Sequence, residues 1–118
     1  MSIAYDAIPI VCDGAGAATV YSTVPMDGEL VALRVTIGTL ANGAVDLVIT
    51  DSQSGMALLT ISNLAASTDY FPRGAAVNPA NSAITDSFVK LPVTGGIKAV
   101  VAQGGAAGAG TLHCWVER

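Results

Sequence analysis

Few residues in this chain are of the types that do chemistry, and their spacing favours structural roles. The single histidine, His113, lies in an alternating run near the C-terminus, and no GxSxG-type nucleophile motif accompanies it. A hydrolytic triad needs a nucleophile and a base within hydrogen-bonding reach of each other. We therefore interpret His113 as an outward-facing strand residue and predict that the protein is not an enzyme.

Metal and cofactor sites find equally little support in the sequence. Cys114 follows His113 directly, but neighbouring residues of a strand point to opposite faces, so the two cannot share a metal ion. Asp46 and Asp51 could bind calcium together with loop carbonyls, but the DxDxDG spacing is missing and most Asp residues lie beside turns, where they cap the backbone. The glycine-rich turns do not match a phosphate loop. We predict no metal ion and no cofactor.

The two cysteines, Cys12 and Cys114, lie in strand-like runs near opposite ends of the chain. Cysteine is among the most buried residue types, so two buried free thiols in a reducing cytoplasm are favoured. A disulfide between neighbouring terminal strands stays open as the alternative, because it depends on a Cα separation that the sequence does not show.

Charged side chains are scarce along the whole chain. They make up 12% of the 118 residues, with a net charge of −4, and the mean hydropathy is +0.58, whereas about 25% charged residues is usual in soluble domains. We therefore expect copies of the chain or a larger assembly to cover part of its surface. Five Lys and Arg residues form no basic stripe, which argues against nucleic acid and anionic membranes as partners.

The first residues do not have the pattern of a secretory signal. They lack a cationic segment, and Asp6 interrupts the apolar stretch, so no signal peptide is expected. No apolar run reaches the roughly 18 to 20 residues that a spanning helix needs.

Alternating apolar and polar residues recur along the chain, separated by Gly, Pro, Asn and Asp clusters at intervals of roughly 8 to 15 residues. This pattern predicts an all-β protein: one domain over residues 1–118, an antiparallel β-sandwich of seven or eight strands, for which a jelly roll is one possible topology. Residues 63–87 lose the alternation, and we expect a long irregular loop there, with room for one short strand.

Several local features are more specific. Pro9 cannot donate a ladder hydrogen bond, so residues 3–12 are expected to form an edge strand. Asn42-Gly43 predicts a hairpin joining residues 29–38 to residues 44–50, and Asp27-Gly28 predicts a tight turn before it. The adjacent Leu58 and Leu59 indicate a bulge or a strand that is buried on both sides. In residues 29–38 the expected core positions are Val31, Leu33, Val35 and Ile37, with Arg34 facing outward.

The edge strand and the long loop are the predicted contact regions, because exposed loops and strand edges commonly form contacts. Tyr70 and Phe71 in the loop could also form an aromatic platform for a sugar, or simply anchor the loop. The candidate contact residues are Ile3, Tyr5, Ile8, Ile10, Tyr70, Phe71 and Arg73.

Three segments resemble a known group of proteins: the run from Val45 to Asp51 that continues into Ser54 to Leu59, the tetrapeptide Tyr70-Phe71-Pro72-Arg73, and the run from Ile97 to Gly105. In these segments and in its overall style the chain resembles the small β-sandwich virion proteins of tailed bacteriophages, especially capsid decoration or cement proteins. No diagnostic motif accompanies the likeness, so it implies no functional residues.

The resemblance implies a non-enzymatic virion protein, made in the host cytoplasm, that binds the outside of the assembled shell. Its partners would be copies of itself, with a trimer as the favoured state, and a major capsid protein. Two alternatives stay open: a head-tail connector or tail component, and a carbohydrate- or ligand-binding β module.

Overall fold

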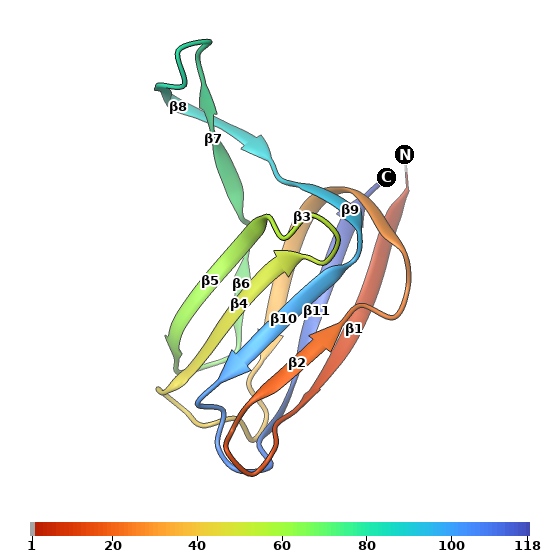
Figure 1. Cartoon of the computed structure of the whole chain (residues 1–118), viewed down its shortest axis with the longest axis vertical. Coiled ribbons are helices and arrows are strands. Elements are labelled where there is room, and N and C mark those ends of the chain that lie inside the picture. The colour runs from red at the N-terminus through yellow and green to blue at the C-terminus, as the bar shows by residue number, and fades with distance from the viewer. Residues whose placement is uncertain (1) are drawn as a thin grey trace.

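Eleven antiparallel strands form the fold of residues 2–118, the part of the chain that the computed structural model describes (Figure 1). The five-stranded sheet contains, in spatial order, β1 (Ile3–Val11), β11 (Ala109–Glu117), β3 (Met26–Thr36) and β6 (Thr68–Tyr70), with β9 (Pro92–Gly95) paired to the start of β3. The four-stranded sheet contains, in spatial order, β2 (Ala18–Tyr21), β10 (Ile97–Ala102), β4 (Val45–Asp51) and β5 (Ala57–Leu64). The antiparallel all-β fold is confirmed, whereas a jelly roll stays a prediction. The predicted number of seven or eight strands was too low, because residues 63–87, expected as a loop, contain several strands.

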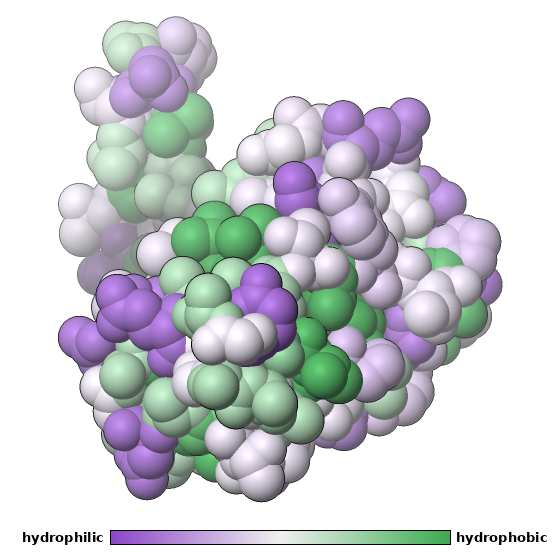
Figure 2. All heavy atoms as spheres, turned by 60° about the horizontal axis from the view of Figure 1, so that its bottom comes forward, coloured by the Kyte–Doolittle hydropathy of each residue, from purple (hydrophilic) through white to green (hydrophobic). Residues whose placement is uncertain are grey.

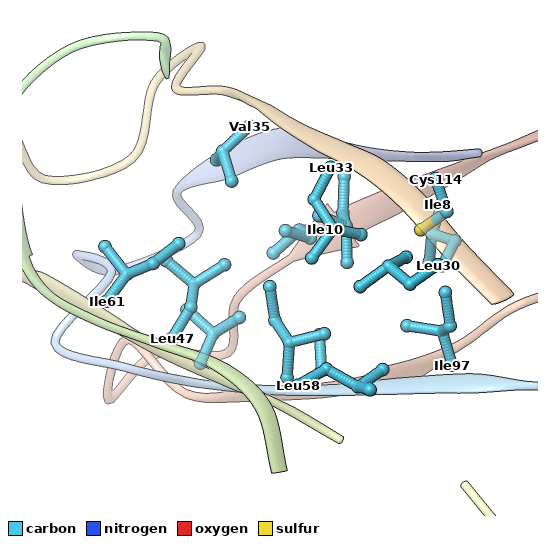
Figure 3. Packing of buried hydrophobic residues seen from close by; sticks show 14 of the residues in the cluster. Ile8, Ile10, Leu30, Leu33, Val35, Leu47, Leu58, Ile61, Ile97 and Cys114 are labelled. Atoms are coloured by element: carbon cyan, nitrogen blue, oxygen red, sulfur yellow. The ribbon is translucent and has the colours of Figure 1, made fainter. Parts of the chain in front are cut away.

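The core lies between the two sheets. It is built from the residues that point inward, which alternate with outward residues along each strand. β1 shows the pattern most clearly, because every second residue from Ala4 to Ile10 is buried. Figure 3 shows side chains of the five-stranded sheet, such as Leu33, facing Leu47 and Ile97 of the four-stranded sheet. Since β1 pairs only with β11, its prediction as an edge strand is confirmed.

Asn42-Gly43 does not close the predicted hairpin. β3 and β4 belong to different sheets, so the segment between them crosses from one layer to the other. Gly43 has a φ of 82°, as a turn residue should, but its N–H donates to the carbonyl of Leu64 at 2.8 Å, at the far end of β5. Leu40 is buried and holds the crossing segment against the core.

Asp27-Gly28 lies inside β3 and is not a turn. Gly28 has a φ of 146°, and a Cβ atom at this position would lie 2.1 Å from the carbonyl oxygen of Glu117. The glycine is therefore needed because the end of β11 passes directly over it.

Two register shifts change which residues face the core. A shift in the β3–β11 pairing places Leu30 in the core and leaves Val31, predicted as a core residue, only partly buried. A shift in the β4–β5 pairing at Leu58 confirms the bulge that the Leu58-Leu59 pair indicated.

The segment predicted as a long irregular loop is mostly strand. β6 joins the five-stranded sheet, and β7 (Arg73–Val77) pairs with β8 (Ala83–Lys90) in a separate two-stranded hairpin. Figure 1 shows this hairpin, which we call the arm (residues 73–90), projecting away from the sandwich. The sequence hid these strands because neither face of the arm is buried in the sandwich, so no apolar alternation marks them.

Asp51 links the two sheets through a buried carboxylate. It lies at the end of β4, with none of its surface exposed. Its Oδ1 accepts from the Thr94 N–H of β9 at 3.1 Å, and its Oδ2 accepts from the hydroxyls of Ser54, at 2.6 Å, and of Thr94. Burial alone would raise the pKa of this carboxyl, but these hydrogen bonds outweigh it and lower the pKa to about 2.

We expect Asp51→Asn to lower the free energy of unfolding at pH 7 by about 2 kcal/mol. Because the folded-state pKa lies below the unfolded one, this contribution is present above about pH 4 and disappears as the pH falls toward about 2. Urea unfolding of both proteins across this range measures the difference. Asp86→Asn, at an exposed carboxylate of the arm, is the control and should have little effect. A difference for Asp51→Asn that stays constant with pH would contradict this role.

Candidate functional site

Three aromatic rings cluster on the outer face of the five-stranded sheet. Tyr5 of β1 lies opposite Trp115 of β11, and their ring centroids are 5.1 Å apart. His113 lies two residues before Trp115 on the same face, with its ring centroid 6.2 Å from that of Trp115. The period-two geometry of the strands places all three side chains outward.

Both nitrogens of His113 have hydrogen-bonding partners. The Tyr5 hydroxyl lies 2.7 Å from Nδ1, and the Thr36 hydroxyl lies 3.2 Å from Nε2. A neutral imidazole accepts at one nitrogen and donates at the other, so this pair of hydroxyls satisfies it. His113 is an outward-facing strand residue as predicted, and it helps to hold the aromatic cluster together.

A hollow of about 330 Å³ lies beside this cluster. We call it the aromatic cleft. Its lining comes from β3, from β6 and the residue that follows it, and from β11: Ala32, Leu33, Arg34, Asp69, Phe71 and Trp115.

The polar edge of the aromatic cleft is one ion pair. Nη1 of Arg34 lies 2.6 Å from Oδ1 of Asp69, across the β3–β6 pairing, and both side chains are about half exposed. An exposed pair of this kind contributes at most about 1 kcal/mol to stability. Arg34 faces outward as predicted, and the rest of the lining is largely apolar.

The predicted contact residues differ in how far they are exposed. Ile3 and Tyr5 are about half exposed and Phe71 is 67% exposed. Arg73 is also exposed, and it donates to the carbonyls of Val31 and Pro72. Tyr70 instead packs against the core, so Tyr70 and Phe71 do not form a shared platform, and Phe71 contributes to the aromatic cleft.

Ile8 and Ile10 were wrongly predicted as contact residues. Both are buried and point into the core with the rest of the inward face of β1 (Figure 3). The outward residues of the strand are the alternate ones, including Ile3, Tyr5 and Val11.

The arm exposes large apolar side chains that the sequence did not single out. Phe88 is 68% exposed, and the others are about half exposed: Val77, Ile84 and Val89. Figure 2 shows the arm standing apart from the body, with apolar (green) spheres among polar ones on its surface. The sequence does contain large apolar residues between turn-forming residues in this segment. Because apolar and polar residues do not alternate there, these residues did not indicate strands.

The two thiols and the Asp6 carboxylate of the sandwich have structural roles. Cys12 and Cys114 are buried and free, in line with the favoured prediction. Burial, with a smaller effect from Asp6, raises the pKa of the Cys114 thiol to about 12, so it stays protonated. Asp6 accepts from the Thr23 N–H at 2.6 Å and from its hydroxyl, tying β1 to the β2–β3 connection. Within residues 2–118, no group of three or more His, Cys, Asp or Glu residues is placed to hold a metal ion.

Comparison with family models, with curated proteins and with solved structures finds no match to this chain. Residues 2–118 include no helix of the length and apolar character needed to span a membrane. Two features of the described residues stand out as candidate contact sites, the arm and the aromatic cleft.

The alternation in β1 provides a paired test of core and surface. We expect Ile10→Asp to lower the free energy of unfolding by more than about 4 kcal/mol, because it places an unpaired charge in the core. The next residue, Val11, is 67% exposed, and Val11→Asp should change it by less than about 0.5 kcal/mol. Urea unfolding measures both. Similar losses in the two variants would contradict the register of β1.

Proposed function

We propose that this chain is a non-enzymatic structural protein of a bacteriophage virion, most specifically a capsid decoration protein that binds the outside of the assembled shell and reinforces it. The arm is the observation that carries the proposal. It is a two-stranded hairpin that leaves the sandwich and exposes several large apolar side chains. Such an element adds nothing to the buried core of its own domain, and it suits a subunit that contacts its neighbours.

The arm gains little stability from the sandwich, because it contributes nothing to the buried core. An isolated two-stranded hairpin is marginally stable at best in water. Contiguous exposed apolar surface commonly marks an interaction site, and covering Phe88 and its apolar neighbours by another protein would stabilise the hairpin. On a shell, copies of the chain or capsid subunits would supply that cover.

The composition supports the same proposal. Only 12% of the residues are charged, and the outer face of the five-stranded sheet carries the aromatic cluster. Protein interfaces are enriched in aromatic residues, and charged residues are depleted at their centres. A homo-oligomer, with a trimer as the favoured state, bound to a major capsid protein fits this surface, and the site of action is the virion.

The aromatic cleft favours one second candidate, a carbohydrate- or ligand-binding module. Trp115 and Phe71 could stack on a sugar ring, and the Arg34–Asp69 pair could bind its hydroxyls. A head-tail connector or tail component would use the arm in the same way as a decoration protein. The position of the protein on the virion distinguishes these two roles.

Removing the arm tests the proposal directly. We design a variant in which Asn-Gly replaces residues 75–88, joining Gly74 to Val89, which pair across the hairpin, through a tight turn. The cut leaves the Lys90–Glu117 ion pair of 3.1 Å in place. We expect thermal unfolding close to that of the full chain, because the arm contributes nothing to the buried core, and capsid binding weakened at least about tenfold.

Light scattering and sedimentation with capsids of the encoding phage are the measurements. A trimer, or a monomer that sediments with capsids, supports the proposal. Binding by the armless variant equal to that of the full chain would contradict the role of the arm. A monomer that stays in the supernatant would contradict the virion role, and a change in Trp115 fluorescence with sugars would then favour the ligand-binding module.

A further inference from the structure

The arm and the aromatic cleft are complementary features of the same surface. The cleft is a mostly apolar hollow with Trp115 and Phe71 among its lining residues. The arm presents Phe88, its largest and most exposed apolar side chain, at 68% exposure. The cleft has no apolar side chain filling it, and Phe88 has no pocket around it.

Phe88 does not fill the cleft of its own chain. It is not among the residues that line the cleft, and its high exposure shows that no pocket of its own chain encloses it. Figure 1 shows the arm directed away from the sandwich. The cleft that could receive Phe88 therefore belongs to another molecule.

Asp86 of the arm and Arg34 of the cleft carry opposite charges. Asp86 lies two residues before Phe88 and takes part in neither of the two ion pairs formed within residues 2–118. Its φ of 58° marks an irregularity of β8 close to Phe88. The cleft carries Arg34, whose guanidinium is partly exposed and could pair with Asp86 of an incoming arm as well as with Asp69.

We infer that the arm of one copy docks on a second copy of this chain, with Phe88 inserted into the aromatic cleft between Trp115 and Phe71. This inference rests on the proposed function and names the contact by which the subunits would associate. The contact joins two different surfaces, so it is complete either when two copies exchange arms reciprocally or when several copies close a ring. In both arrangements every arm and every cleft is occupied.

An apolar side chain suits the cleft better than a saccharide does. The Arg34 and Asp69 side chains provide the charged groups of the lining, and they already bind each other at 2.6 Å. A sugar ring needs several directed hydrogen bonds, whereas the rest of the lining is largely apolar. A phenyl ring needs only contact with Trp115 and Phe71, which stabilises aromatic pairs beyond simple burial.

The single tryptophan of the chain makes the contact measurable. Trp115 lines the cleft, so its emission should shift to longer wavelengths on dilution, together with the fall in mass measured by light scattering. We expect Phe88→Ala to raise the dissociation constant about thirtyfold or more and to keep the emission of the dissociated state. Tyr21→Ala, at an exposed aromatic residue of the opposite sheet, is the matched control and should behave as the unmodified chain.

Cross-linking between two variants identifies the two surfaces that meet. Ala32→Cys places a thiol in the cleft, and Ala75→Cys places one directly across the hairpin from Phe88, on the same face of the arm, while the native cysteines are buried. A short bis-maleimide should link the variants when they are mixed and should link neither variant alone. Adding Phe88→Ala to the Ala75→Cys chain should abolish the product.

The outcomes separate this inference from the proposed function. A stable oligomer whose mass and Trp115 emission are unaffected by Phe88→Ala overturns the arm-to-cleft contact and leaves the virion proposal in place. A monomer that still sediments with capsids likewise overturns the arm-to-cleft contact and leaves the virion proposal in place. A monomer that does not bind capsids overturns both, and a change in Trp115 emission with sugars assigns the cleft to a saccharide.

Discussion

Burial of two apolar sheet faces against each other is the constraint on which the rest of this structure depends. Residues such as Leu33 on one sheet and Leu47 on the other are completely buried, and period-two geometry then sends their neighbours outward. A slip of one residue in β1 would expose Ile8 and Ile10 and turn Pro9 and Val11 inward. The facing layers therefore determine register, and register determines which side chains are free for contact.

The deviations from regular strands adjust the sandwich to this constraint. The irregularity in the β3–β11 pairing moves Leu30 into the core, and the close passage of Glu117 over β3 leaves room only for glycine at position 28. Asp51 then joins the layers with hydrogen bonds from Ser54 and Thr94. These features keep the sandwich closed without help from the arm.

The aromatic cleft and the arm are two places outside the core that present large apolar side chains. The aromatic cleft gathers Trp115 and Phe71, and the arm presents Phe88, with nothing of its own chain enclosing that ring. A rigid sandwich with a projecting hairpin can place a contact at a distance from its body. The proposed function fits this arrangement, because folding stability and the proposed contacts then depend on different residues.

The sequence alone determined the strand class, the outward position of His113 and the edge position of β1, because alternation and Pro9 are local signals. It also offered a bulge at Leu58-Leu59 as one of two alternatives, which the structure then decided. Tertiary structure decided the rest. Asn42-Gly43 became a crossing between layers because β3 and β4 bury their faces against each other instead of pairing. The arm was not predicted because strands without a buried face show no apolar alternation. The aromatic cleft was not predicted because Phe71 and Trp115 come together only when β6 and β11 flank β3 in one sheet.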